Sequence, residues 1–324
     1  MLALLIVVTL AADRLFALGL ERLLLASEFR FSELYRGGRT AEVVVIGNSR
    51  SVHSFYAPVL AERSCRTVLH LGFNGVTPRA AALLLGDYVR LNAAPRLVVV
   101  EASMLFAQNR FLPQLAPYTG RSPALAAAID DASDGLLPWR RVFHLYRFNS
   151  DLLFRALVYL GRTDQTWVNR GRRINDALIA GHDPSTIAEN PVRPEAATAM
   201  DDLLDLAESE GFAVALVVAP YFHSFFEDEV SARFLAEFRA WLPTRFPRAR
   251  LVDFAEFPLA RDGFADPIHL NIDGARELTR ALVERLPQLR ACAEGTAPVT
   301  ADRVGLHPPA TSPDARAGDA AGGP

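Results

Sequence analysis

Short runs of β-branched and aliphatic residues alternate along the chain with longer segments whose apolar positions recur at helical spacing. Five runs have the length and composition of buried strands and lie at 41–47, 66–72, 96–102, 213–219 and 250–254. Helical spacing follows at 77–91, 191–210, 230–241 and 271–286. Strands that alternate with helices predict an α/β fold in which a parallel sheet is covered by helices on both faces.

A long insertion without a clear strand separates the third and fourth strands, at about 105–212. Helical spacing within it predicts helices at 123–132 and 143–159, and we expect the insertion to form a cap or side wall over the carboxyl edge of the sheet. The main α/β domain is predicted to span 27–292. Beyond it, 293–324 is rich in Ala, Pro, Gly and Asp without periodicity, which predicts a disordered tail.

The first 26 residues are far more apolar than a surface helix. The run 2–12 is uncharged, and apolar character resumes after Asp13 and Arg14. The run is shorter than the roughly 20 residues that cross a bilayer, and it lacks the basic region and small-residue cleavage site of a secretory signal. Three interpretations stay open: a membrane anchor whose start is truncated or misassigned, an unusual signal sequence, or a buried amphipathic helix. We favour an anchor over 1–26, with the domain on the extracytoplasmic side.

Composition narrows the function classes. Hydrophobic residues make up 50% of the 324, and the formal net charge is −3, so no basic excess favours nucleic-acid binding. The two cysteines, Cys65 and Cys292, lie far apart and lack metal-type spacing. Two inert thiols are favoured over one disulfide. No metal-ligand spacing and no glycine-rich phosphate loop occurs, so we expect neither a metal nor a cofactor.

Polar residues that can carry acyl-transfer chemistry follow three of the predicted strands. Ligands of open parallel sheets bind at the carboxyl ends of the strands. The first strand ends in Gly-Asn-Ser-Arg-Ser (47–51), and the last is followed by Asp-Pro-Ile-His-Leu-Asn (266–271). Ser49 is therefore the candidate nucleophile and His269 its general base. Asp266 would orient the imidazole and stabilise its protonated form.

The second strand ends in Gly-Phe-Asn-Gly (72–75) at the same predicted edge. Backbone N–H groups of Ser49 and Gly75 would face an oxyanion that develops on the substrate. A glycine at position 75 allows the backbone to approach the substrate closely. These residues complete the elements of a serine-dependent acyl-transfer site.

These blocks together resemble the SGNH (GDSL-type) hydrolases. Val-Val-Val-Ile-Gly-Asn-Ser-Arg-Ser (43–51) is similar to their first block, with Asn48 where the family has Asp. Leu-Gly-Phe-Asn-Gly (71–75) is similar to the second, which carries an oxyanion-hole glycine, and Asp-Pro-Ile-His-Leu-Asn-Ile-Asp-Gly (266–274) to the last. The resemblance implies a three-layer α/β/α, flavodoxin-like fold with a five-stranded parallel sheet. It also implies hydrolysis or transfer of an ester-linked acyl group.

The chain departs from the family at the third block. There the family has Gly-x-Asn-Asp, whose Asn donates to the oxyanion, whereas this chain continues after the third strand as Glu-Ala-Ser-Met-Leu-Phe (101–106). Asn74, Asn109 or a residue of the insertion would have to substitute, or the oxyanion hole has two donors only. Since loss of one donor costs about 10² to 10³ in rate, slow hydrolysis is expected. A membrane-anchored branch of the family, found in bacterial envelopes, often lacks this block. The similar layout of this chain shifts the expected activity toward that of an O-acyltransferase.

Other side chains near these blocks have a structural and a functional interpretation. Arg50 would bind an anionic substrate group or form a surface salt bridge, and His223, after the fourth strand, would contact substrate or fill the insertion's interior. His53 is interpreted as structural. Glu101 is expected to pair with Arg50 or with an Arg of the insertion. The segment 167–173 combines Trp with three Arg and would grip a sugar or anionic polymer, or form an exposed basic face.

The sequence therefore predicts a single-pass protein of the bacterial inner membrane with a periplasmic catalytic domain. It would hydrolyse or transfer an acyl group on a cell-envelope glycan through a Ser49 acyl-enzyme. One alternative is an esterase or lipase for a small ester. Another is a non-catalytic SGNH-like envelope protein that binds glycan or a multi-pass membrane acyltransferase. Expected partners are thus an acylated polysaccharide or small ester, the membrane and that acyltransferase, and no nucleic acid.

Overall fold

Five short strands form the centre of the molecule. The computed structural model describes residues 1–107, 111–132, 139 and 141–290. The strands are β1 (Val43–Ile46), β2 (Val68–His70), β3 (Leu97–Glu101), β4 (Ala213–Val218) and β5 (Arg250–Asp253). All pairs are parallel and the order is β2-β1-β3-β4-β5. This is the flavodoxin-like order and confirms the predicted α/β fold.

Helices cover both faces of the sheet, so the molecule has three layers. Alternate residues of a strand point to opposite faces: Val44 packs with α5 (Pro78–Leu91), α9 (Pro194–Glu210) and α11 (Glu229–Arg245). Val45 packs on the other face with α4 (Ala57–Ser64) and α12 (Ile272–Arg285). Because both faces are buried, the strands read as continuous apolar runs rather than alternating ones.

The insertion between β3 and β4 consists of short helices. They are 3₁₀ helices η1 (Ala102–Phe106), η2 (Leu112–Tyr118), η4 (His144–Phe148) and η5 (Pro184–Glu189), and α-helices α6 (Pro123–Ala132), α7 (Asp151–Val158) and α8 (Asp176–Ala180). The single helix predicted over 143–159 is wrong. The helix is interrupted at Asn149. Ser150 then caps α7 by accepting a hydrogen bond from the N–H of Leu152.

Five of the remaining short elements surround the carboxyl edge of the sheet: α3 (Ser49–Ser54), α10 (Ser224–Glu227), η6 (Arg261–Gly263), β6 (Phe264–Asp266) and β7 (His269–Leu270). The last, η7 (Pro287–Leu289), lies at the amino edge, where Arg66 donates to the Gln288 carbonyl at 3.2 Å. Strands β6 and β7 form an antiparallel hairpin. Asn271 then caps α12, since its side chain accepts hydrogen bonds from the N–H groups of Asp273 and Gly274.

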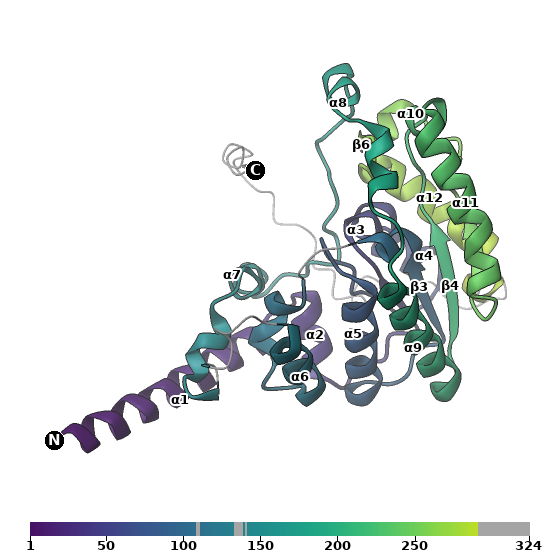
Figure 1. The fold of residues 1–324 in the computed structure, drawn as a ribbon. Coiled ribbons are helices and arrows are strands. Elements are labelled where there is room, and N and C mark those ends of the chain that lie inside the picture. Colours follow the sequence, from purple (N-terminus) through teal and green to yellow (C-terminus); the bar gives the residue numbers. More distant parts are fainter. Residues whose placement is uncertain (108–110, 133–138, 140, 291–324) are drawn as a thin grey trace.

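Two helices precede the sheet. Helix α1 (Leu2–Ala26) is long and apolar enough to cross a membrane, and its first part projects away from the domain (Figure 1). Its second part packs against the domain through Ala17 and Leu24. Helix α2 (Arg30–Arg36) follows, which the sequence did not predict, and Arg30 and the five residues after it are buried.

Cys65 ends α4 in a left-handed conformation, with φ of 52°, and is disulfide-bonded. The preference for two free thiols is therefore wrong for Cys65. Cys292, the other cysteine of the sequence, lies outside the described residues, as does the predicted disordered tail.

Candidate active site

Ser49 stands at the first position of α3, directly after the turn that ends β1. Gly47 makes this turn with φ of 150°, and a Cβ there would lie 2.8 Å from the Cβ of Ser51 and 3.0 Å from that of Glu101. Asn48 caps α3 by accepting a hydrogen bond from the N–H of Arg50 at 2.9 Å. As the first residue of a helix, Ser49 has an N–H without an intrahelical acceptor, and its side chain sits at the carboxyl edge of the sheet.

The β6–β7 hairpin brings Asp266 and His269 to the same edge. His269 Nε2 lies 2.9 Å from Ser49 Oγ, and His269 Nδ1 lies 3.0 Å from Asp266 Oδ1. These contacts fit a neutral imidazole that donates from Nδ1 to the carboxylate and accepts the hydroxyl proton at Nε2. The structure thus brings together the three residues that the sequence singled out as nucleophile, base and orienting acid.

Asp266 is held in place and ionised by its own loop. Its carboxylate also accepts hydrogen bonds from the N–H groups of Ile268 at 3.1 Å and His269 at 2.9 Å. Burial by itself raises the pKa of Asp266, but the hydrogen bond and charge of His269 and these N–H groups outweigh it and lower the pKa below its usual value. A carboxylate that stays charged can stabilise a protonated His269.

Arg50 is buried and joins several loops by hydrogen bonds, so its interpretation as a substrate-binding residue is corrected. Its side chain is 5% exposed. The guanidinium donates to the Ile268 carbonyl at 2.6 Å and to those of Ala219 and Pro220 at 2.7 and 2.9 Å. Its Nε lies 3.5 Å from Glu101 Oε1, which confirms the expected Glu101–Arg50 pair. Because these protein acceptors occupy the guanidinium, Arg50 fixes the hairpin rather than binding substrate.

The second strand's turn lies beside the Ser49 turn. The N–H of Phe73 donates to the Gly47 carbonyl at 3.0 Å, two residues before Ser49. Asn74 is exposed, and Gly75 is half-buried with φ of 80°, a left-handed conformation that favours glycine. The roles of Gly75 and Asn74 in an oxyanion hole stay predictions. Asn109 lies outside the described residues.

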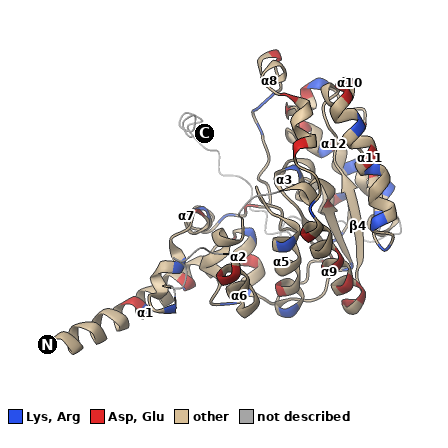
Figure 2. Cartoon of the chain, in the orientation of Figure 1, with Lys and Arg blue, Asp and Glu red and all other residues tan. Residues whose placement is uncertain are grey.

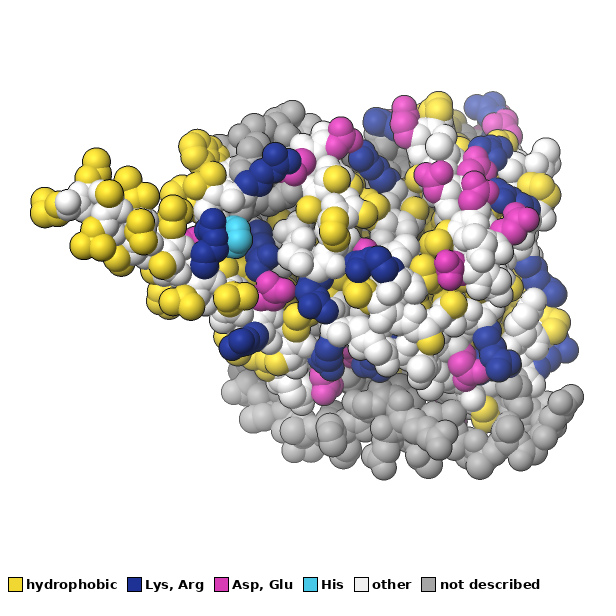
Figure 3. Space-filling view, turned by 90° about the horizontal axis from the view of Figure 1, so that it is seen from below, with side chains coloured by type: hydrophobic (Ala, Val, Ile, Leu, Met, Phe, Trp, Pro, Cys, Tyr) yellow, Lys and Arg dark blue, Asp and Glu magenta, His cyan; other side chains and the backbone are white. Residues whose placement is uncertain are grey.

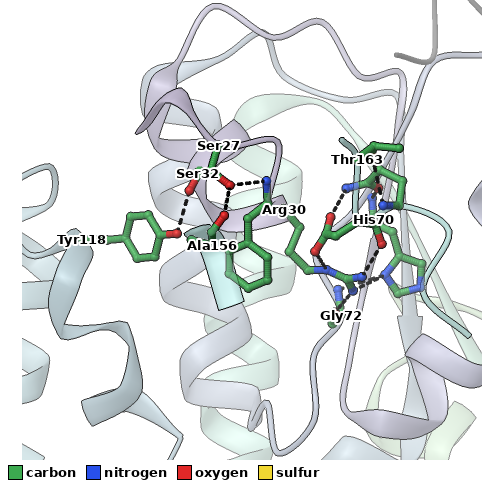
Figure 4. A network of polar contacts seen from close by, with 11 residues as sticks. Ser27, Arg30, Ser32, His70, Gly72, Tyr118, Ala156 and Thr163 are labelled. Carbon is green, nitrogen blue, oxygen red and sulfur yellow. Dashed lines mark hydrogen bonds and ion pairs between the residues drawn. The ribbon is translucent and has the colours of Figure 1, made fainter. Parts of the chain in front are cut away.

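A buried network that the sequence did not predict supports this turn (Figure 4). Arg30 of α2 is fully buried and donates to the Gly72 carbonyl and, at 2.6 Å, to the Asp164 carboxylate of the insertion. His70 Nδ1 accepts the Gly72 N–H at 3.1 Å, and His70 Nε2 lies 3.1 Å from the Ser51 carbonyl. The turn at Gly72 is therefore held by α2, β2 and the insertion together.

These contacts explain why His70 is neutral. Nδ1 accepts a hydrogen bond, so the ring carries its proton on Nε2. Burial, with a further effect from the Arg30 charge, lowers the pKa of His70 to about 3. Sequence reasoning missed the network because Arg30 and Asp164 are 134 residues apart and neither belongs to a motif.

His53 contacts the candidate base directly. Its ring centroid lies 5.1 Å from that of His269 and 5.8 Å from that of Trp167, and its Nδ1 accepts the N–H of Asn169 at 3.3 Å. Burial and the neighbouring His269 lower the pKa of His53 to about 3. A neutral His53 adds no positive charge beside His269, and it joins the insertion to the site.

The other candidate residues have different surroundings. His223 has a side chain 62% exposed, with Nε2 3.9 Å from Glu227 Oε1, and the structure does not join it to the Ser49–His269–Asp266 cluster. Trp167 packs on Phe73, with 5.8 Å between ring centroids. Arg173 pairs with two surface carboxylates. Within the described ranges, no three His, Cys, Asp or Glu side chains form a group that would hold a metal.

Comparison with known proteins adds little to this geometry. No protein-family model and no curated protein matches the chain. Among solved structures, the chain is similar to the crystal structure of a proposed acylhydrolase from Bacteroides fragilis, with 12% identity and a TM-score of 0.36. That match covers 75% of this chain and 84% of the other. At this level of similarity, the assignment to the flavodoxin-like α/β folds rests on the chain's own strand order, β2-β1-β3-β4-β5.

Proposed function

We propose that the protein is a serine-dependent acyl-ester hydrolase or O-acyltransferase of the SGNH type. The observation that carries the proposal is the continuous hydrogen-bonded series from Ser49 Oγ to His269 Nε2, at 2.9 Å, and from His269 Nδ1 to Asp266, at 3.0 Å. A hydroxyl, an imidazole and a carboxylate in this order activate a serine for nucleophilic attack.

In the first step, Ser49 Oγ attacks the ester carbonyl while its proton passes to His269 Nε2. Asp266 stabilises the resulting imidazolium, and the N–H groups of Ser49 and Gly75, with the Asn74 side chain, are the proposed donors to the oxyanion. The carbon–oxygen bond of the ester then breaks, and the leaving alcohol takes the proton from His269. An acyl group remains on Ser49.

In the second step, an acceptor hydroxyl attacks the acyl-enzyme. Its proton passes to His269 Nε2 and then to Ser49 Oγ, which leaves as the new ester or free acid forms. Water as acceptor gives hydrolysis, and a sugar hydroxyl gives transfer. We propose an acetylated envelope glycan as the substrate class, with His223 near the path of a long substrate.

We further propose that α1 anchors the protein in the bacterial inner membrane, with the α/β domain in the periplasm. The length and apolar composition of α1 support an anchor. Its burial at Ala17 and Leu24 supports a helix that stays with the domain rather than one that is cleaved. The disulfide at Cys65 fits an oxidising compartment.

The test uses the full chain in detergent with p-nitrophenyl acetate, followed by release of nitrophenol and by intact mass. We expect a burst and an added acetyl group, both lost in Ser49→Ala. Ser51→Ala is the matched control, because Ser51 Oγ is buried two residues away on the same helix without a hydrogen-bond partner in the described chain. Asp266→Asn should lower kcat by about 10⁴.

Two outcomes would contradict the proposal. A burst and adduct retained in Ser49→Ala would remove Ser49 from the mechanism. Absence of both in the folded wild type, even with acetylated oligosaccharides as donors, would favour a protein that binds glycan without reacting. If the adduct forms, addition of an oligosaccharide acceptor separates transfer from hydrolysis, because transfer yields acetylated sugar in place of free acetate.

A further inference from the structure

Exposed apolar side chains gather in one region of the molecule. Outside α1, the large hydrophobic side chains that are exposed in the described chain lie within 139–160, with Val230 the single exception. They are Trp139, Val142, Phe143, Phe154, Val158 and Leu160. A cluster of this kind on an otherwise polar surface marks an interaction site. Three of the six, Phe154, Val158 and Leu160, lie near the carboxyl end of α1, where the Tyr159 carbonyl accepts the N–H of Glu28 at 3.0 Å. We call the other three, Trp139, Val142 and Phe143, the foot.

The foot is fixed directly beside α1. Asp13, which is buried in the middle of α1, accepts hydrogen bonds from the N–H groups of His144 at 2.7 Å and Leu145 at 3.0 Å. Arg14 donates to the Val142 carbonyl at 2.8 Å. These bonds place Val142 and Phe143 beside the point where α1 leaves the domain.

The apolar surface of α1 continues onto the foot. Past Asp13, the side chains of Leu15 and Phe16 are still 70% and 68% exposed. An apolar groove of about 760 Å³ lies between α1 and the insertion, lined among others by Phe16 and Phe143. Figure 3 shows apolar side chains along the projecting helix and onto the adjoining domain. A surface that takes up the helix would therefore also meet the foot.

The charges beside the foot are suited to an anionic lipid surface. Figure 2 shows no charged residue on the projecting end of α1, and both acidic and basic residues where it joins the domain. The Arg14 and Arg141 side chains are 39% and 71% exposed, and they pair with Asp13 and Asp130. Tryptophan is typical of the boundary between headgroups and hydrocarbon, and long arginine side chains near a helix end extend to the headgroups.

We propose that the foot lies in the headgroup region of the membrane that α1 enters, so that the domain rests on the bilayer rather than hanging from a free helix. Trp139 and Phe143 would enter the boundary, and Arg14 and Arg141 would meet lipid phosphates. The inference rests on the anchor part of the proposed function and is independent of the chemistry at Ser49.

The experiment places a single tryptophan in the full chain reconstituted in vesicles of phosphatidylcholine and phosphatidylglycerol with brominated acyl chains. Trp167 and Trp241 are changed to Phe, which leaves Trp139. Two controls change Trp139 to Phe as well and carry Leu5→Trp, on the projecting end of α1, or Val230→Trp, on α11 away from α1 in Figure 1. Thermal unfolding checks that each variant is folded.

We expect the lipid to quench Trp139 several times more strongly than the tryptophan at position 230. Quenching at position 5 but not at Trp139 would overturn the foot and leave the anchor. Shielding of Trp139 from both brominated lipid and soluble acrylamide would also overturn it, because a protein surface would then cover the foot. No quenching at either position would overturn the foot and the anchor together, while the acetyl adduct on Ser49 would be unaffected.

Discussion

The side chains around Ser49 are of two kinds: those that form the hydrogen-bonded series and those that hold the neighbouring loops in place. Ser49, His269 and Asp266 form the hydrogen-bonded series. Arg50 and Asn271 are buried, and each binds backbone groups of neighbouring loops. Placement of the proposed nucleophile and base therefore depends on residues that hold the surrounding loops.

Replacement of Arg50 separates these two roles. Arg50→Met removes the hydrogen bonds to the hairpin and leaves the buried Glu101 without its charge partner, although Ser103 still donates to it. We therefore expect a loss of about 3–5 kcal/mol in the free energy of unfolding. Activity should fall mainly in kcat because the hairpin carries His269. Denaturant unfolding and steady-state kinetics with p-nitrophenyl acetate measure the two effects, with exposed Arg63→Met on α4 as control. Normal stability with a raised KM alone would restore Arg50 as a substrate-binding residue.

Sequence reasoning at the residue scale succeeded where chain position alone decides a location. Ser49 follows a strand, and Asp266 and His269 lie on a loop that returns to the same edge, so the pattern predicted their meeting. It failed for Arg50, because burial of an arginine depends on acceptors contributed by distant loops. It also missed His70, which looks like an ordinary strand residue until Gly72 is placed beside it.

At the scale of elements, the strands were predictable because runs such as Val-Val-Val-Ile (43–46) are buried on both faces. Helix α2 was not, because three of its six buried residues are polar or charged. Arg30 pairs with Asp164, Ser32 Oγ lies 2.8 Å from the Tyr118 hydroxyl, and Glu33 pairs with an arginine. Partners from other parts of the chain satisfy these groups, and no local pattern shows them.

Helix α1 has a projecting part and a part that packs against the domain. Two deletions distinguish what each part contributes to stability. Deletion of 2–7 removes exposed residues only, so we expect an unchanged melting temperature in detergent. Deletion of 2–26 also removes Leu24 from the core and Asp13 from its N–H partners, so burial of apolar surface worth about 1.5–3 kcal/mol for one leucine is lost. Thermal unfolding of the two shortened chains checks this. Equal melting temperatures would mean that α1 contributes nothing to the fold.

At the scale of the whole molecule, buried neutral histidines make stability depend on pH. Burial lowers the pKa of both His70 and His53 to about 3, against 6.5 in the unfolded chain. Between pH 3 and 6.5 the unfolded chain therefore binds more protons, so stability falls as the pH falls. The slope approaches about 1.4 kcal/mol per pH unit for each histidine.

Glu33 has the opposite effect on the pH dependence of stability. The test therefore compares the unsubstituted protein with a variant that lacks only one histidine. Burial raises the pKa of Glu33 to about 7, against 4.5 for the unperturbed group. The stability that this group contributes is present below pH 4.5 and is lost as the pH rises to about 7. His70→Gln keeps Glu33 and His53 but removes one titration. We expect the variant to be less stable at pH 7, and its deficit to shrink between pH 6.5 and 4 in denaturant unfolding. A constant deficit would show that His70 titrates alike in both states.

The distance along the chain between Ser49 and His269, 220 residues, has a consequence for biosynthesis. The serine leaves the ribosome early, whereas its base arrives only with the final hairpin. A serine hydroxyl without a base is a poor nucleophile, so on the proposed function a partly made chain lacks the reactivity of the finished one. The contact between Ser49 and His269 forms only after the final hairpin has folded against the sheet.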